Sequence, residues 1–202
     1  MTDMATKHAI AQLVPHGARV LDLGCGDGAM LAHLQQTRGC TGYGVEIDDA
    51  NVLACVQRGV NVIQLNLDEG LAMFGDASFD VVLQLDTLQH LRNAEVMLRE
   101  TVRVGRVGII AFPNFAHWPN RLSILKGRMP VTKRLPYQWY DTPNIRVGTH
   151  ADLALLAQRC GLQVLDSFGL QNGQTVRFAP NLLAGTSVYR LSLAKTSSNA
   201  RP

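Results

Sequence analysis

A short apolar strand that runs directly into a glycine-rich turn is the feature that most limits the possible folds of this chain. Residues 20–28 read Val-Leu-Asp-Leu-Gly-Cys-Gly-Asp-Gly, with Gly24, Gly26 and Gly28 closing the run. Glycine adopts positive φ angles without steric cost and lets the backbone approach a ligand closely. The sequence therefore predicts an α/β protein with a cofactor site at this strand-to-helix turn.

Two acidic residues of the same stretch, Asp22 and Asp27, indicate the charge of that cofactor. A dinucleotide presents its pyrophosphate to the helix N-terminus, where a carboxylate would repel it. S-adenosylmethionine carries an ammonium and a sulfonium, which carboxylates attract. The spacing Gly24-x-Gly26-x-x-Ala29 also satisfies the loose dinucleotide pattern, so an NAD-dependent oxidoreductase stays open as an alternative.

A third acid, Glu46, ends the next predicted strand about twenty residues downstream of the turn. A carboxylate at this place can accept hydrogen bonds from both hydroxyls of a ribose. Because NAD and S-adenosylmethionine both contain a ribose, Glu46 supports a nucleoside site without choosing between them.

Strand and helix patterns alternate along the chain. Strands are predicted at residues 19–23, 41–46, 60–65, 79–83, 105–112, 162–168 and 186–193, and helices at 7–14, 28–36, 49–58, 93–103 and 150–160. Repeated β-α units predict a parallel sheet with helices on both faces. The ligand site is then expected at the carboxyl ends of the strands, where the glycine turn and Glu46 both lie.

Residues 113–149 interrupt this alternation. Five prolines punctuate the segment, which also holds both tryptophans and the tyrosines Tyr137 and Tyr140. Prolines exclude a long helix or a central strand, and so many aromatic residues argue against disorder. We expect an ordered lid over the strand ends, within a single domain spanning residues 1–202. The polar residues 195–202 are expected to fray.

Composition excludes several other classes of protein. A hydrophobic content of 47% and a charged content of 17% are typical of a globular domain. The net charge of +3 comes without a long basic stripe, which argues against binding to nucleic acid.

A local basic cluster between Arg121 and Arg134 is either a solvated face or a site for an anionic substrate or an acidic partner. Four cysteines without a C-x-x-C pair predict no metal site. Without a signal peptide or a long apolar run, we expect a cytoplasmic protein that does not contact a membrane.

Several motifs together resemble a known family. Asp22-x-Gly24-x-Gly26-x-Gly28, Glu46 and the Phe-Asp-Val-Val run at 79–82 stand in the order of class I S-adenosylmethionine-dependent methyltransferases. Three further runs resemble the MetW family of methionine-biosynthesis proteins more closely. They are Phe-Pro-Asn-Phe-Ala-His-Trp at 112–118, Lys-Gly-Arg-Met-Pro-Val at 126–131 and Leu-Pro-Tyr-Gln-Trp-Tyr-Asp-Thr-Pro-Asn-Ile at 135–145.

The resemblance implies a Rossmann-like class I methyltransferase fold. Its seven-stranded, mostly parallel sheet would end in an antiparallel strand that forms a hairpin with the one before it. The resemblance also implies a cofactor site in which Asp22 faces the methionyl ammonium through water and Glu46 holds the ribose. The other implied cofactor contacts are Gly24, Cys25 and Gly26 along the methionyl group, Ile47, Asn66 and Leu67 at the adenine, and Gln84 and Leu85 beneath the sulfonium. The family usually has an aspartate in place of Asn66, whose amide oxygen can still accept from the adenine amine.

No residue stands out as the general base of a methyl transfer. The candidates are His117, Tyr137, Tyr140 and His90. Two functions follow from the resemblance. One is a methyltransferase of methionine biosynthesis that acts on a small-molecule acceptor. The other is a non-catalytic partner that senses S-adenosylmethionine or S-adenosylhomocysteine and activates a homoserine O-acyltransferase.

Overall fold

The computed structural model describes residues 4–194, whose strands form one mixed sheet in the order β3-β2-β1-β4-β5-β8-β6-β7. The strands are β1 (Arg19–Leu23), β2 (Thr41–Glu46), β3 (Val62–Gln64), β4 (Phe79–Leu85), β5 (Gly105–Pro113), β6 (Leu162–Gln171), β7 (Gln174–Val176) and β8 (Thr186–Leu193). Strands β1 to β5 are parallel, and β8 is antiparallel to both β5 and β6. The predicted α/β class and the mostly parallel sheet are confirmed. The expectation for residues 195–202 lies outside the described residues.

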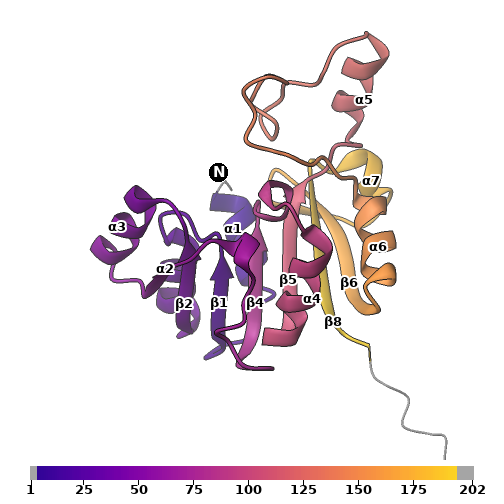
Figure 1. Ribbon diagram of the computed structural model, residues 1–202. Coiled ribbons are helices and arrows are strands. Elements are labelled where there is room, and N and C mark those ends of the chain that lie inside the picture. The colour runs from indigo at the N-terminus through magenta and orange to yellow at the C-terminus, as the bar shows by residue number, and fades with distance from the viewer. Residues whose placement is uncertain (1–3, 195–202) are drawn as a thin grey trace, which may run out of the picture.

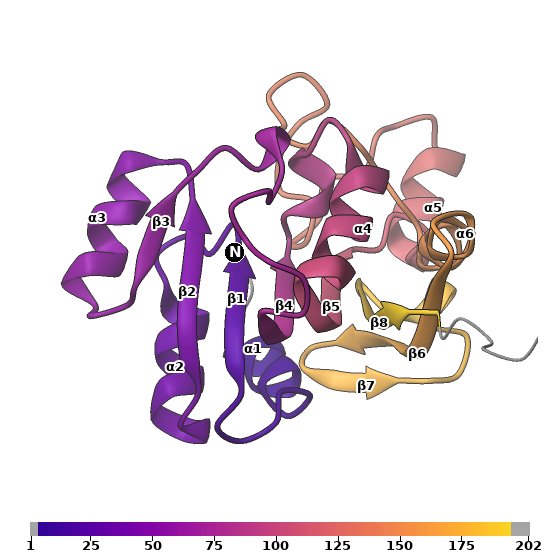
Figure 2. The ribbon, with the colours of Figure 1, turned by 60° about the horizontal axis from the view of Figure 1, so that its bottom comes forward.

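The sheet has one strand more than expected. Strand β6 continues past Phe168 to Gln171 and turns back through Asn172 and Gly173 into the short edge strand β7 (Figure 2). Both turn residues have positive φ angles, 51° and 78°, which is the geometry that an Asn-Gly pair favours in a tight hairpin. Strands β6 and β8 are antiparallel neighbours as predicted, but β7 and a short helix separate them in the chain.

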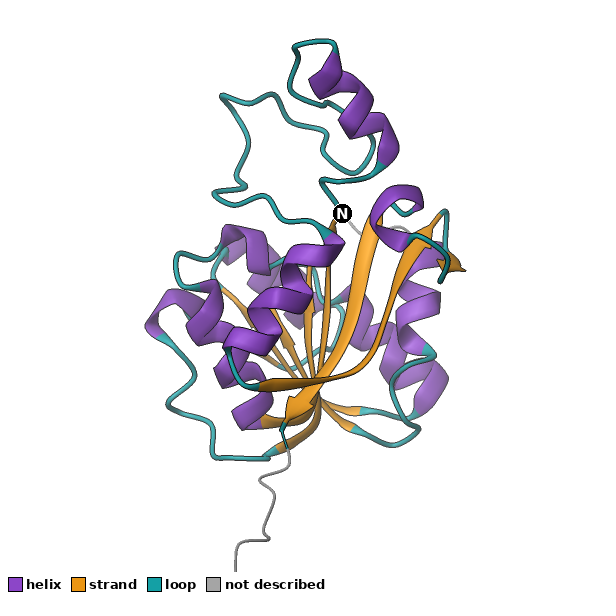
Figure 3. Cartoon of the chain, turned by 90° about the vertical axis from the view of Figure 1, so that its right-hand side faces the viewer, coloured by secondary structure: helices purple, strands orange, loops and turns teal. Residues whose placement is uncertain are grey.

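Helices cover both faces of the sheet, as Figure 3 shows with the sheet seen nearly edge-on. They are α1 (Met4–Ala11), α2 (Ala29–Arg38), α3 (Asp49–Gln57), α4 (Ala94–Val104), α5 (Trp118–Leu125), α6 (His150–Arg159) and α7 (Pro180–Leu183), with 3-10 turns η1 (Leu67–Glu69) and η2 (Leu88–His90). Helices α1 and α2 pack on one face, and α4 and α6 on the other. Asp48 caps α3, and Thr149 and Asp152 form a reciprocal capping box at the start of α6.

Alternation along the strands decides which side chains face which layer. In β1, Val20 packs with the core of α1 and α2, whereas Leu21 and Leu23 pack with the core beneath α4. Asp22 shares the parity of Val20 and therefore lies on the α1 side. In β4, Leu83 lies on that same side.

The 113–149 segment rises above the end of the sheet toward which β1, β2 and β4 point, with α5 near its tip (Figure 1). Its two ends meet, because Asn114 and Gly148 form a bridge and the Phe115 amide donates to the Gly148 carbonyl at 3.0 Å. The C-terminal part of the segment is anchored to η2, since the amides of Ile145 and Arg146 both donate to the Gln89 carbonyl at 3.1 Å.

The side chain of Asn114 fixes the base of this segment. It is buried, and its Nδ2 donates to the carbonyls of Pro180, Asn181 and Ala184 at 3.3, 3.1 and 2.8 Å. Its Oδ1 accepts from the amides of Ala116 and His150, each at 3.1 Å. One amide group therefore joins the 113–149 segment to the starts of α6 and α7.

Replacing this side chain should destabilise the fold. We expect Asn114→Ala to lower the free energy of unfolding by about 2–4 kcal/mol, because several buried backbone groups lose their partner. Urea unfolding measures the change. Asn93→Ala is the matched control, since the exposed Asn93 side chain makes no capping hydrogen bond at α4 and its loss should cost about 0.5 kcal/mol or less. Equal stability of the two variants would contradict this role.

Candidate functional site

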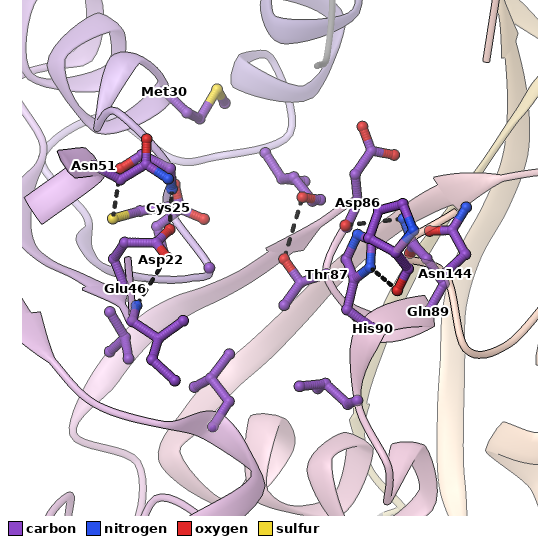
Figure 4. Close-up of a pocket in the computed structure, with 18 of the residues that line it drawn as sticks. Asp22, Cys25, Met30, Glu46, Asn51, Asp86, Thr87, Gln89, His90 and Asn144 are labelled. Carbon is purple, nitrogen blue, oxygen red and sulfur yellow. Dashed lines mark hydrogen bonds between the residues drawn. The ribbon is translucent and has the colours of Figure 1, made fainter. Parts of the chain in front are cut away.

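A cavity of about 770 Å³ opens at the carboxyl ends of β1, β2 and β4 (Figure 4). The structure brings nine of the ten sequence-predicted cofactor residues to its wall. They are Asp22, Gly24, Cys25, Gly26, Glu46, Ile47, Asn66, Leu67 and Leu85. These residues come from four separate strand ends and the turns that follow them.

The glycine turn is shaped by close packing on one side and open space on the other. Gly24 has a φ of +70°, and a Cβ there would lie 2.7 Å from Oγ1 of Thr87, which itself donates to the Leu23 carbonyl at 2.8 Å. Gly26 has a φ of +56°, and a Cβ there would meet nothing within 4 Å. The turn therefore packs tightly against the end of β4 while its outer side leaves room for a ligand.

Glu46 is held rigidly by backbone donors. Its Oε2 accepts from the Gly26 amide at 2.8 Å, and its Oε1 accepts from the amides of Ile47 and Asp48 at 2.8 and 3.1 Å. A carboxylate has about four acceptor positions, so these three bonds leave capacity for a ligand hydroxyl. The geometry fits the recognition of a ribose.

Asp22 is buried, and its Oδ1 has no hydrogen-bond partner in the part of the chain that the structure describes. Burial, and then the charge of Glu46, raise the pKa of Asp22 from 3.8 to about 7, while the Lys7 ammonium acts in the opposite direction. A buried carboxyl group without a partner is costly and marks a functional site when it faces a cavity. A bound cation would supply the missing partner.

Sequence reasoning missed Lys7, which lies on α1 and lines the same cavity. No spacing rule connects it to Asp22, because the contact depends on how α1 packs against the sheet.

The second acid of the turn has a different environment from the first. Asp27 is half-exposed and forms an ion pair with Arg58 at 2.7 Å, while its Oδ1 accepts from the Ala29 amide at 3.2 Å. Its charge is therefore already balanced. Although both acids belong to the same turn, only Asp22 presents an unpaired carboxyl group to the cavity.

The end of β3 carries two polar residues that reach the cavity. Asn66 caps η1, since its Oδ1 accepts from the Asp68 amide at 3.1 Å. Asp68 also lines the cavity, and its Oδ1 accepts from the Arg92 amide at 2.9 Å. Both side chains are thus fixed at the expected adenine end.

Gln84 is the predicted cofactor residue that the structure places elsewhere. It is fully buried, and its Nε2 donates to Oγ1 of Thr101 on α4 at 2.6 Å. The physical reason is strand alternation, since Gln84 points to the α4 face and its neighbour Leu85 to the cavity.

Two of the four candidate bases line the cavity, namely His90 and Tyr137. The other two do not, since His117 precedes α5 and Tyr140 packs edge-to-face against Trp139 with 71% of its surface exposed. Burial lowers the pKa of His117. Nδ1 of His90 lies 3.1 Å from the Pro143 carbonyl, and because a carbonyl only accepts, Nδ1 is the donor. In the neutral form of the ring, Nε2 then carries the lone pair.

Residues 4–194 hold neither a cluster of metal ligands nor a membrane-spanning helix. No three His, Cys, Asp or Glu side chains gather there in a way that would hold a metal ion. No helix in that range has the length and apolar character needed to cross a membrane.

Solved structures with the same architecture define the class of fold. An S-adenosylmethionine-dependent methyltransferase from Thermotoga maritima, described as a possible histamine N-methyltransferase, superposes with a TM-score of 0.69 at 18% identity, covering 95% of this chain and 88% of that one. The putative methyltransferase bound to the Trm112 activator of Haloferax volcanii gives 0.70 at 18% identity, covering 93% and 88%. The chain has the class I methyltransferase fold.

The family is narrower than the fold. The family model "Methionine biosynthesis protein MetW" matches residues 4–191, and the chain belongs to this family. The bifunctional methionine biosynthesis protein MetXA/MetW of Rhodopirellula baltica is 36% identical over 196 residues, which are 90% of this chain and 32% of that protein. Norajmaline N-methyltransferase of Rauvolfia serpentina is 28% identical over 105 residues, 48% of this chain and 36% of that protein. The chain thus spans about a third of the length of these curated relatives.

The unpaired carboxyl group predicts an unusual effect of pH on stability. The folded protein keeps a proton on Asp22 up to a pKa of about 7, whereas the unfolded chain loses it near 3.8. Stability contributed by this group therefore falls as the pH rises through that window, by about 2–3 kcal/mol between pH 5 and pH 8. We expect Asp22→Asn to remove this fall and to be more stable than the wild type at pH 8.

Urea unfolding at both pH values measures the effect. Asp141→Asn is the matched control, because Asp141 is exposed and its removal should leave the pH dependence as it is. The interpretation is wrong if Asp22→Asn is less stable than the wild type at pH 8 and keeps the full pH dependence.

Proposed function

We propose that the cavity binds S-adenosylmethionine and that the protein transfers its methyl group to a small-molecule acceptor in methionine biosynthesis. The observation that carries the proposal is the buried, unpartnered carboxyl group of Asp22 beside the backbone-held carboxylate of Glu46. Glu46 would hold the ribose, and Asp22 the methionyl ammonium. Ile47, Asn66 and Leu67 would surround the adenine, and the Lys7 ammonium suits the methionyl carboxylate.

The charge of the site argues against a dinucleotide. A pyrophosphate at the glycine turn would lie close to Asp22, whose Oδ1 accepts no hydrogen bond within the described residues. A sulfonium or ammonium gains from the same carboxylate. The site therefore favours a cationic ligand over NAD.

In a methyl transfer, the protein mainly positions the two reactants and excludes water. Bound S-adenosylmethionine supplies a methyl group already activated by the sulfonium. Transfer would join the acceptor's lone pair to that carbon while the electron pair of the carbon–sulfur bond goes to sulfur, and a base of the protein would take the acceptor's proton. His90 is suited to that task, because its Nδ1 donates to the Pro143 carbonyl and its Nε2 carries the lone pair of the neutral ring.

The 113–149 segment serves in this proposal as the lid of a single domain. Seven of its residues line the cavity together with the strand ends, namely Pro113, Lys133, Arg134, Pro136, Tyr137, Pro143 and Asn144. Pairing of Asn114 with Gly148 closes the base of the lid.

Calorimetric titration tests the cofactor. S-adenosylmethionine and S-adenosylhomocysteine should bind, and NAD should not. Because the pKa of Asp22 is about 7 and the ammonium selects its ionised form, affinity for S-adenosylhomocysteine should rise by about tenfold from pH 5.5 to pH 7.5. The heat at pH 6 should vary with the buffer as a proton is released.

Asp22→Asn should weaken binding and abolish this pH dependence, and Glu46→Gln should weaken binding at every pH. Tight binding of NAD that Asp22→Ala strengthens would instead support an oxidoreductase.

A second function is favoured by one observation. The Rhodopirellula relative carries the names MetXA and MetW in a single bifunctional protein, and joining two modules in one chain keeps them at high effective concentration. In this function the protein would bind a homoserine O-acyltransferase and report the level of S-adenosylmethionine to it without catalysis. The outer side of the lid exposes Leu125, Trp139 and Tyr140, with 84%, 71% and 71% of their surfaces accessible, and large apolar side chains of this kind anchor protein interfaces.

Acyltransferase assays with and without this chain test the second function. Activation should require S-adenosylmethionine and should be lost in the double variant Trp139→Ala/Tyr140→Ala. Leu53→Ala is the control, because Leu53 is similarly exposed, at 57%, but lies on α3. An acyltransferase that responds to neither the chain nor the cofactor would exclude a role as its activator.

A further inference from the structure

The cavity extends well beyond the residues assigned to the cofactor. Its other end is formed by Asp86, Gln89 and His90 just after β4, and by the lid residues Lys133 and Arg134 that close over them. Figure 4 shows Asp86, His90 and Asn144 grouped on the side opposite Asp22 and Glu46. A methyl acceptor bound at this second end would lie next to the S-adenosylmethionine proposed at the strand ends.

The charge of this end is opposite to that of the cofactor end. Arg134 forms an ion pair with Asp86 at 3.1 Å, and both side chains are only 20% exposed. Lys133 has no ion pair in the described part of the chain. Two cations therefore face the one carboxylate that this end contributes to the cavity wall.

A buried donor at this end is left unused. Nε of Arg134 is inaccessible to solvent and has no hydrogen-bond partner within residues 4–194. A guanidinium presents several N–H groups in one plane, which suits it to oxygen anions. An unpaired buried donor costs free energy that an acceptor oxygen would recover.

The structure also divides the basic cluster that the sequence left unassigned. Arg121, Lys126 and Arg128 lie outside the cavity wall, whereas Lys133 and Arg134 belong to it. Only the second pair is placed to meet a small ligand, so a solvated face does not account for the whole cluster.

We propose that this end of the cavity is an acceptor subsite for a small anionic molecule, whose carboxylate or similar oxyanion is held by Lys133 and Arg134. The proposal rests on the methyl transfer proposed above and adds the chemical class of its substrate. The bound anion balances the excess positive charge under the lid and turns the acceptor's nucleophilic atom toward His90. Neutral or cationic molecules of the same size lose this contact.

Fractionated acceptors test the proposal without knowledge of the substrate. A protein-free extract of cells that contain this protein is separated on an anion-exchange resin at pH 7 into retained and unretained molecules. Each fraction is then incubated with the protein and S-adenosylmethionine labelled in its methyl group. We expect label to enter a small molecule only with the retained, anionic fraction.

Charge reversal at the lid provides the second measurement. Lys133→Glu should raise KM for the retained acceptor by about tenfold or more, the loss expected for one charge-assisted contact, with a smaller change in kcat. Its affinity for S-adenosylhomocysteine should stay within about twofold of the wild type, which shows that the fold and the cofactor end are intact. Lys126→Glu, on the same segment but outside the cavity wall, should behave as the wild type.

The possible failures are distinct. Label that enters molecules of the unretained fraction alone, or a Lys133→Glu variant with unchanged KM, would overturn the anionic subsite and leave methyl transfer in place. Absence of label with both fractions, while S-adenosylhomocysteine still binds, would overturn methyl transfer itself and the subsite with it.

Discussion

The buried carboxyl group of Asp22 is the constraint on which the rest of the site depends. A carboxylate removed from water is costly unless hydrogen bonds or a cation compensate it, and Oδ1 of Asp22 accepts no hydrogen bond among the described residues. Glu46 lies close enough to raise the pKa of Asp22 further, yet its own oxygens are satisfied by three backbone amides. The fold thus retains a destabilising group at one point of the cavity, which is typical of a site adapted to a ligand rather than to stability.

The cofactor end could be predicted because it follows from sheet topology. Asp22, Glu46, Asn66 and Leu85 each stand at or just after the end of a strand, and β1 to β4 are parallel neighbours. The β-α alternation brought the glycine turn and Glu46 to one edge, and the family resemblance added Asn66 and Leu85. The resemblance also implied Gln84, whose side chain lies on the opposite face, because a shift of one residue along a strand reverses the side to which a side chain points.

Residues that depend on long-range packing were beyond sequence reasoning. Asp27 is neutralised by Arg58, which is 31 positions away in the chain, and Lys7 approaches the site only through the packing of α1. The division of the basic cluster depends on how the 113–149 segment folds back over β4. That path is set by tertiary contacts, such as the bond from the Arg146 amide to the Gln89 carbonyl, which no local pattern encodes. The turn at Asn172 and Gly173 was, in contrast, a readable hairpin signal.

The charges at the two ends of the cavity favour methyl transfer over cofactor sensing. A sensor of S-adenosylmethionine needs the acidic end around Asp22 and an outer surface for its partner, and nothing more. A sensor does not need the cationic part of the cavity wall. There, Nε of Arg134 is buried without an acceptor, and Lys133 forms no ion pair within the described residues. The buried Nε of Arg134 costs stability when it is left without an acceptor, so pairing with a second ligand accounts for its retention. The opposite polarity of the two ends would orient a cationic methyl donor and an anionic acceptor toward each other, an arrangement that serves a reaction between two ligands better than the detection of one.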